Sequence, residues 1–113
     1  MAKMVWELTR LETVLLSVLV GRERYGLEIR DAAGEVGQDV SLASLYTTLN
    51  RLEKAGLVRG RWGERTEARR GARRRYYELT ARGEQALRDT RDVWKRVLRR
   101  LPALGLVGTS VMS

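Results

Sequence analysis

The feature that most constrains this sequence is a change of hydrophobic period at Gly56. Before it, leucines recur at the spacing of a helix, on one face made of Leu42, Leu45, Leu49 and Leu52. After it, apolar and aromatic residues alternate, which is the pattern of a β-strand. The sequence therefore predicts a helix that ends at Gly56 and is followed directly by strands.

The side of this predicted helix opposite the leucines is small, polar and basic, and no acidic residue lies at its centre. Such a face is typical of a helix that enters a groove of DNA. Ser41 stands where a residue that caps the first turn is expected, and we also count it as a DNA contact. The candidates for base-edge or groove contacts are Ser44, Thr47 and Asn50. Arg51 and Lys54 either read guanine or hold phosphate groups, and phosphate is the commoner role for such residues.

Two predicted strands follow the helix and are joined by an arginine-rich segment. Val58, Gly60 and Trp62 share one face of the first strand, and Tyr77 and Leu79 share one face of the second. Trp62 is expected to pack this ribbon onto the rest of the domain. A basic helix followed by a two-stranded ribbon predicts a winged helix, which is a DNA-binding device.

Residues 63–72 are predicted to form a loop at the tip of the wing, because they contain two glycines and mixed charge. The expected contacts are with phosphates or the minor groove, and a solvated hairpin tip is the alternative. The candidate residues in and beside the loop are Arg65, Arg69, Arg70, Arg73 and Arg74.

The charge of the chain is concentrated on this helix and wing. The formal net charge is +8. Residues 51–75 hold ten basic and three acidic residues, an excess of +7. A basic surface is often only a solvated one, but its concentration on a helix and ribbon favours a nucleic-acid partner.

Three stretches resemble the PadR family of bacterial transcriptional regulators, of the short winged helix-turn-helix type. They are RERYGLEI at 22–29, LYTTLNRLEKAGLV at 45–58 followed by Trp62, and RRRYYELTARGEQAL at 73–87. The resemblance extends over about residues 8–98. Ala43 and Thr47 depart from it, since the family usually has Gly and Pro there. These departures leave the expected fold unchanged and bear on base preference.

Two further helices are predicted upstream of the basic helix. The first, over 5–20, is apolar nearly all round, so we expect a second subunit to cover the face that a small domain leaves open. The segment 21–24 is a predicted polar turn. The second helix is predicted from Tyr25 to Gly34 or Val36, with core contacts from Leu27, Ile29 and Ala33.

A last helix is predicted from a cap at Thr80 to about Leu101, and Pro102 ends it. Its apolar residues follow a heptad-like seam that needs a cover outside the DNA-binding core. The resemblance implies that the first and last helices form a homodimer interface. The candidate interface residues are Trp6, Leu11, Leu15, Val18, Leu87, Thr90, Trp94, Val97 and Leu101.

The expected fold is thus mainly α, an α+β winged helix. A three-helix winged helix-turn-helix core with a two-stranded wing occupies 1–79, a dimerisation helix occupies 80–101, and a tail, docked or disordered, occupies 102–113. The resemblance implies repression of transcription, with release by a small-molecule effector or another signal. A dimer that presents two such helices to successive grooves implies a near-palindromic operator. Some short PadR proteins bind planar aromatic compounds between the helices of the dimer. Trp6 and Trp94 are the candidate effector contacts, and interface core is the alternative role for both.

Several classes of protein conflict with the composition. Cysteine and histidine are absent, so disulfides are excluded, and no zinc site, other metal site or histidine relay is expected. The apolar run 11–20 contains Glu12 and is too short to span a bilayer, and a secretory signal is lacking, so we expect a cytoplasmic protein. No cofactor motif or catalytic constellation suggests an enzyme. A winged-helix module for protein partners and an RNA-binding protein are the alternatives.

Overall fold

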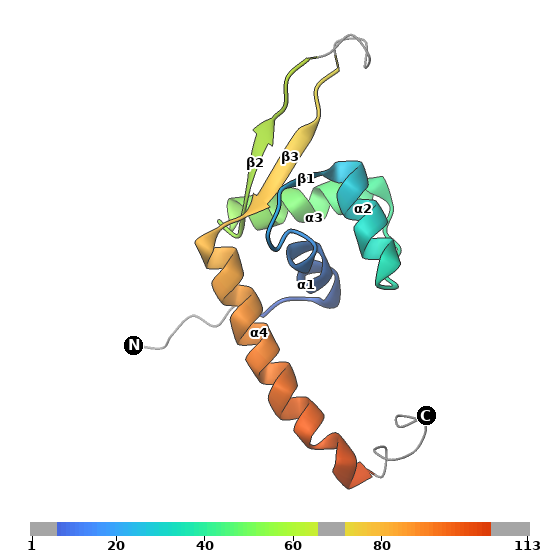
Figure 1. Cartoon of the computed structure of the whole chain (residues 1–113), viewed down its shortest axis with the longest axis vertical. Coiled ribbons are helices and arrows are strands. Elements are labelled where there is room, and N and C mark those ends of the chain that lie inside the picture. Colours follow the sequence, from blue (N-terminus) through green and yellow to red (C-terminus); the bar gives the residue numbers. More distant parts are fainter. Residues whose placement is uncertain (1–6, 66–71, 105–113) are drawn as a thin grey trace.

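The computed structural model describes residues 7–65 and 72–104. Three helices, α1 (Arg10–Ser17), α2 (Gly26–Glu35) and α3 (Leu42–Lys54), pack under a small antiparallel sheet (Figure 1). The strands of the sheet are β1 (Arg24–Tyr25), β2 (Val58–Trp62) and β3 (Arg75–Leu79). Helix α4 (Ala81–Arg99) extends away from this body and is followed by a 3-10 turn, η2 (Leu101–Leu104). The predicted winged-helix architecture is confirmed.

One hydrophobic core joins the three helices to the sheet. All its members are at most 4 % exposed, and they are Leu15, Leu16, Leu19, Ile29, Ala33, Leu45, Leu49, Leu52, Leu57, Val58, Tyr77 and Ala86. Because α1, α2, α3, β2 and β3 all contribute to this core, the angle between α3 and the wing is fixed by packing.

Helix α1 is shorter than predicted. Its first turn is set by a capping box, in which the Thr9 hydroxyl accepts from the Glu12 backbone N–H at 3.1 Å. In return, the Glu12 carboxylate accepts from the Thr9 backbone N–H at 2.9 Å. The helix therefore begins at Arg10 instead of residue 5, and it ends at Ser17 instead of residue 20. The apolar content of 5–20 did not indicate these ends.

Helix α2 begins directly after Tyr25, as predicted within one residue, and ends at Glu35. Its predicted core contacts Ile29 and Ala33 are fully buried. The prediction for Leu27 was wrong, since this side chain is 43 % exposed. Leu27 lies in the first turn and faces an open hollow below the wing, so no core atoms cover it.

Helix α3 is capped by Ser41, whose hydroxyl accepts from the Ser44 backbone N–H at 3.1 Å, as predicted. Its central leucines, Leu45, Leu49 and Leu52, are fully buried. Leu42, on the same face, is 37 % exposed, because the first turn of the helix extends past the core. The chain leaves the helix at Gly56, whose φ of +82° favours glycine.

The sheet confirms the predicted strand faces, because Val58 pairs with Leu79, Gly60 with Tyr77, and Trp62 with Arg75. It has three strands in the order β1-β3-β2, one more than predicted. The extra strand, β1, forms in part of the predicted polar turn and pairs with the free edge of β3. A strand of two residues is too short to show a periodicity.

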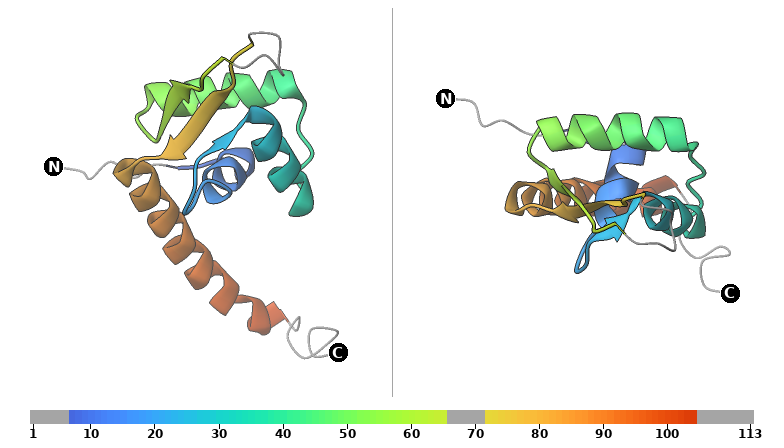
Figure 2. Two further views of the ribbon diagram at one scale, coloured as in Figure 1. Left: turned by 45° about the horizontal axis from the view of Figure 1, so that its top comes forward. Right: turned by 90° about the horizontal axis from the view of Figure 1, so that it is seen from above.

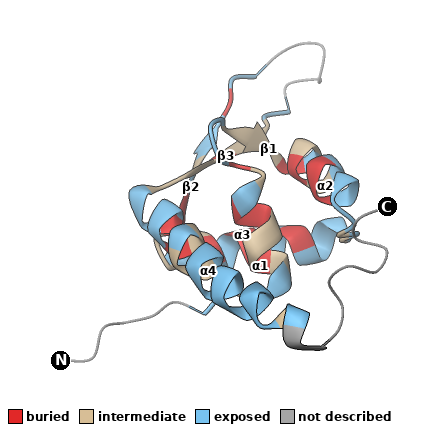
Figure 3. Cartoon of the chain, turned by 60° about the horizontal axis from the view of Figure 1, so that its bottom comes forward, coloured by how far each residue is buried: buried red, intermediate tan, exposed pale blue. Residues whose placement is uncertain are grey.

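Helix α4 is held to the core by its first two turns, and its residues are exposed from Arg91 onward (Figure 3). The Thr80 hydroxyl donates to the Gly56 carbonyl oxygen at 2.6 Å and accepts from the Gly83 backbone N–H at 3.1 Å. A Cβ atom at Gly83 would lie 2.2 Å from the Leu57 carbonyl oxygen, so the close approach requires glycine. The helix ends at Arg99, two residues before the predicted end, and Pro102 lies in η2.

Candidate nucleic-acid interface

The outer face of α3 carries the exposed polar and basic side chains that the sequence indicated. Every residue assigned to DNA contact on this helix is exposed, namely Ser41, Ser44, Thr47, Asn50, Arg51 and Lys54. Among the described residues, Lys54 takes part in none of the ion pairs. Figure 2 shows α3 along one side of the body, next to the hairpin of β2 and β3. The helix and the hairpin therefore lie next to each other on the same body.

Arg51 is less free than its position on the helix suggested. Its Nε donates to Glu12 Oε2 at 3.2 Å, and the Glu12 side chain is only 6 % exposed. The other oxygen of that carboxylate completes the capping box of α1 through Thr9. A buried carboxylate thus holds the Arg51 guanidinium at the edge of α3, while about half of the arginine side chain stays in solvent. This pair was not predicted from the sequence, although the spacing of Thr9 and Glu12 was a signal for the position of the carboxylate.

A second carboxylate ties α3 to the wing. Glu53 Oε2 accepts from the Gly60 backbone N–H at 3.3 Å and from Arg75 Nη2 at 2.9 Å. The Arg75 guanidinium in turn lies 5.8 Å from the centre of the Tyr77 ring. Burial raises the pKa of the Tyr77 phenol above its ordinary value, so this group stays neutral. These contacts fix the start of the wing relative to the helix that it accompanies.

Part of the positive charge of the wing is compensated locally. Arg59 pairs with Glu78, with Nε to Oε2 at 2.9 Å, and Arg61 pairs with Glu23 from the turn before β1. The hydrogen bond from the Arg61 guanidinium holds the pKa of the Glu23 carboxyl below its ordinary value. The charge excess counted from the sequence therefore overstates the number of cations available to a polyanion.

The arginines assigned to the tip of the wing have different positions. Arg65 and Arg73 are exposed, and Arg73 Nε donates to the Gly63 carbonyl oxygen at 2.8 Å. The Arg74 guanidinium lies over the Tyr25 ring, 4.1 Å from its centre, as in a cation–π contact. Arg69 and Arg70 lie outside the described residues.

Trp62 does not pack the wing onto the body, so that prediction was wrong. Its side chain is 54 % exposed. It stands at the far end of β2, opposite Arg75, beyond the part of the sheet where Val58 and Tyr77 reach the core. The guanidinium groups of Arg73 and Arg75 lie 5.9 and 5.1 Å from its ring centre.

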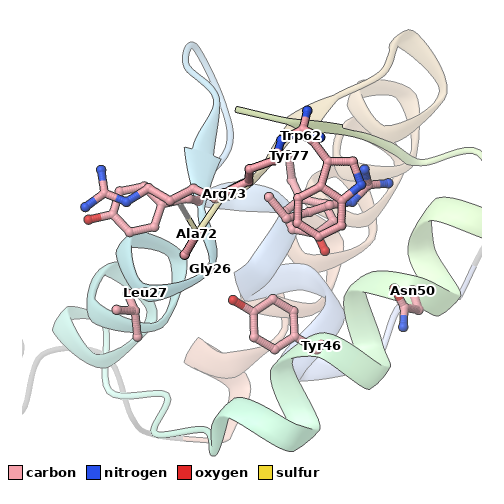
Figure 4. Close-up of a pocket in the computed structure, with 11 residues that line it drawn as sticks. Gly26, Leu27, Tyr46, Asn50, Trp62, Ala72, Arg73 and Tyr77 are labelled. Atoms are coloured by element: carbon pink, nitrogen blue, oxygen red, sulfur yellow. The ribbon is translucent and has the colours of Figure 1, made fainter. Parts of the chain in front are cut away.

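A hollow of about 590 Å³ separates α3 from the wing (Figure 4). Helix α3 contributes Tyr46 and Asn50 to its lining, and the sheet contributes Trp62 and Tyr77. The remaining lining comes from the start of α2 and from 72–75, where β3 begins. No sequence pattern indicated this hollow, because its walls come from four separate segments.

The residues assigned to a dimer interface differ in how far they are exposed in the single chain. Leu15 is fully buried in its own chain, so its assignment to an interface was wrong: it faces the core that α1 shares with α2 and α3. Leu11, Val18, Leu87, Thr90 and Leu101 are half-buried. Trp94 and Val97 are 55 % and 39 % exposed. Trp6 lies outside the described residues, so the pairing of Trp6 with Trp94 stays a prediction.

In the described part of the chain, 7–65 and 72–104, no cluster of acidic side chains is placed to hold a metal ion. None of the helices there has the length and apolar character needed to cross a bilayer.

Known proteins share both the sequence pattern and the fold. Residues 15–89 match the model of the transcriptional regulator PadR-like family. A PadR-like transcription factor from Bacteroides fragilis is 29 % identical, with a TM-score of 0.73 over 83 % of this chain and 88 % of that one. A PadR-like transcriptional regulator from Bacillus cereus is 28 % identical, with a TM-score of 0.71 over 85 % of this chain and 91 % of that one.

A third similar structure is that of PadR from Bacillus subtilis in complex with operator DNA. It is 23 % identical, with a TM-score of 0.63, and the match covers 71 % of this chain and 45 % of that one. At this identity, the match supports the likeness of the fold.

Proposed function

The chain belongs to the PadR-like family of transcriptional regulators, and from this premise we propose that it binds double-stranded DNA as a homodimer and represses transcription. The observation that carries the proposal is the exposed face of α3, where polar and basic side chains stand beside a basic wing. The similarity in fold to a PadR protein solved with operator DNA supports it. Acting on DNA, the protein would work in the cytoplasm.

In the proposed complex α3 enters the major groove. Thr47 and Asn50, near the middle of its exposed face, would read base edges together with Ser44. Lys54 would bind phosphate, and so would Arg51, whose guanidinium Glu12 holds in place. From the wing, Arg65 and Arg73 would reach the backbone or the minor groove.

The homodimer is proposed from the outer face of α4. Val93, Trp94, Val97 and Leu98 are between 39 % and 56 % exposed on this helix. A helical stripe of this kind in a soluble regulator is stable when a second apolar helix covers it. Two-fold symmetry would present two copies of α3 to grooves about 34 Å apart, so the operator should be a near-palindrome.

DNA binding should depend steeply on salt. With three to five phosphate contacts in each subunit, the dimer would make about 6–10 contacts. The affinity should then fall by roughly 10³- to 10⁵-fold between about 50 and 200 mM salt.

The test is fluorescence anisotropy with the duplex upstream of the protein's own gene and with a scrambled duplex, at both salt concentrations. A preference of about tenfold or more for the native duplex at the higher salt is expected of a sequence-specific regulator. Equal and salt-labile binding to both duplexes would instead favour a winged-helix module whose specificity resides in a protein partner. This second function is favoured by the ion pairs of Arg59 and Arg61, because they reduce the positive charge that the wing offers to DNA.

Release by a small-molecule effector is the last part of the proposed function. The position first expected for it was between helices of the dimer, at Trp94 and Trp6. The large exposed fraction of Trp94 in the single chain is compatible with a site completed by a partner subunit.

A further inference from the structure

Helices α3 and α4 are joined through two consecutive residues, Gly56 and Leu57. Gly56 ends α3 with its φ of +82°, and the Leu57 backbone N–H donates to the Leu52 carbonyl oxygen in the last turn at 2.9 Å. The carbonyl oxygens of the same two residues accept from Thr80, the cap of α4. Gly56 accepts from the Thr80 hydroxyl at 2.6 Å, and Leu57 accepts from the Thr80 backbone N–H at 3.1 Å. The end of α3 thus also holds the beginning of α4.

The first turn of α4 lies too close to these residues to change its direction freely. A Cβ atom at Gly83 would come within 2.2 Å of the Leu57 carbonyl oxygen and 2.8 Å of Leu79 Cδ1. The Gly83 backbone N–H donates to the Thr80 hydroxyl at 3.1 Å, and Ala86 is buried in the core. Packing and hydrogen bonds therefore fix the angle between α3 and α4 at this place, which we call the joint: Gly56, Leu57, Thr80 and Gly83.

The rest of α4 extends away from the body, so a small change of direction at the joint becomes a large displacement further along (Figure 1). Trp94, in the exposed apolar stripe, lies 14 residues beyond Thr80. That separation is about 20 Å along the helix, at roughly 1.5 Å per residue. A tilt of about 10° at the joint would displace the stripe by about 3.5 Å, roughly the rise of one base pair.

We propose that the joint determines the spacing between the two half-sites of the operator, with Thr80 and Gly83 as positioning residues that act without touching DNA. The inference rests on the proposed function, in which α4 forms the dimer and each α3 enters a groove. Because no loop separates α4 from the end of α3, the distance and rotation between the two copies of α3 are set by the protein. One inserted base pair moves a half-site by about 3.4 Å and turns it by about 35°, which a rigid joint does not follow.

The first experiment measures the spacing preference by fluorescence anisotropy. The duplexes carry the half-sites of the preferred operator at their native separation and with one or two base pairs more or fewer. For the unaltered chain, a change of one base pair should weaken binding by at least about tenfold, because one half-site then loses its base contacts. A chain that prefers its operator sequence and yet binds all separations equally would overturn the proposal.

Thr80→Val tests the hydroxyl of the joint, because it keeps the shape of the side chain and removes both hydrogen bonds. A looser joint can meet several separations, so the penalty for one base pair should fall to about threefold or less. Thr80→Ser, which keeps the hydroxyl, should retain the profile of the unaltered chain. Thr9→Val is the matched control, since it removes the cap of α1, outside the joint. A tenfold penalty retained in Thr80→Val, or a flattened profile in Thr9→Val, would contradict the proposal.

Gly83→Ala should have a different effect. Its Cβ atom would push α4 away from the Leu57 carbonyl oxygen, so the preferred separation should move instead of the profile becoming flat. Circular dichroism shows whether this variant folds, and Thr80→Val decides alone if it does not. An unchanged profile in folded Gly83→Ala would remove Gly83 from the positioning residues.

A distance measurement without DNA separates the joint from the proposed function. The chain has no cysteine, so spin labels can be attached at Glu35→Cys on α2 and Arg99→Cys at the end of α4. With labelled protein diluted in unlabelled protein, double electron–electron resonance reports the distance within one chain. We expect one narrow distribution, broadened by Thr80→Val and not by Thr9→Val.

The two measurements together distinguish the possible failures. A broad distribution in the unaltered chain would overturn the proposal even if the protein binds its operator. A narrow distribution in a chain that prefers no DNA sequence would leave the rigid joint in place. That result would refute the proposed function, and with it the role of the joint in half-site spacing.

Discussion

Helices α3 and α4 have similar sequence patterns, but α3 is packed within its own chain and most of α4 is exposed. Each begins at a hydroxyl cap, Ser41 or Thr80, and each has an apolar stripe and a charged face. Helix α3 buries three of the four leucines of its stripe fully in its own chain, namely Leu45, Leu49 and Leu52. Helix α4 buries only Gly83 and Ala86. The apolar pattern of a helix therefore shows that it needs a cover, and the tertiary structure decides whether the same chain supplies it.

The largest expected effect is on stability, and it separates the two helices. Leu49→Ala in α3 should lower the free energy of unfolding by about 2–5 kcal/mol, because a fully buried leucine leaves a cavity. Urea denaturation measures this loss, which should be the same at every protein concentration. The matched change Leu98→Ala in α4, where the leucine is 56 % exposed, should cost much less in the dissociated chain. Equal losses in the two variants at low concentration would contradict the contrast between the helices.

The next effect concerns the cover of α4. Trp94→Glu should weaken self-association by about 30-fold or more, since it buries an unpaired carboxylate in an apolar contact. Sedimentation velocity over a range of concentrations measures the dissociation constant. Arg96→Glu is the control: it introduces the same side chain about 160° away around the helix axis, on the charged face. A monomer at all concentrations for the unaltered chain would show that α4 is covered by something other than a second copy.

The contrast between α3 and α4 also explains what the sequence predicted and what it did not. The buried leucines of α3, its cap at Ser41 and its end at Gly56 follow local rules of spacing and hydrogen bonding, and all were predicted. Leu15 and Trp62 were assigned wrongly because their surroundings depend on segments far away in the chain. Leu15 meets α2 and α3 in the core, whereas Trp62 stands past its edge. A pattern of apolar residues does not show whether segments far away in the chain will cover a given side chain.

In the candidate site, too, features that follow from local rules were predicted and features that depend on distant segments were not. The exposed polar face of α3 was predicted residue by residue, because it follows from helical geometry. The pairs Arg51–Glu12 and Arg75–Glu53, separated by 39 and 22 residues, were not predicted. Both depend on how α1 and the wing are packed on α3, and they change which arginines are available to DNA. Long-range ion pairs are therefore the part of this site that only the fold reveals.

Two kinds of DNA contact are proposed on the outer face of α3, base reading and phosphate binding. Substitutions of the two kinds should have different effects on DNA binding. Asn50→Ala should cost about 1–3 kcal/mol on the preferred sequence and relax the preference at one position of each half-site. Lys54→Gln should weaken binding to all sequences alike and reduce the salt slope by about one for each subunit. Anisotropy titrations over a panel of single-base variants at several salt concentrations measure both. No response to either change would remove α3 from the DNA contact surface.

The smallest expected effect tests whether Arg51 binds DNA or only neutralises Glu12. Glu12→Gln keeps the shape of the side chain and removes the charge that holds the Arg51 guanidinium. Thr9→Ala is the matched control, because it breaks the same capping box without touching Arg51. Both variants should lose about 0.5–2 kcal/mol of stability from the weakened cap.

Only Glu12→Gln should alter DNA binding, because a released guanidinium loses the position in which it meets a phosphate. We expect a decrease in affinity of about two- to fivefold, together with a salt slope lower than that of Thr9→Ala. Equal affinities and slopes in the two variants would mean that Arg51 serves the fold alone. The DNA-contacting face of α3 would then consist of the side chains that no other element of the chain holds, and Lys54 would be its cation.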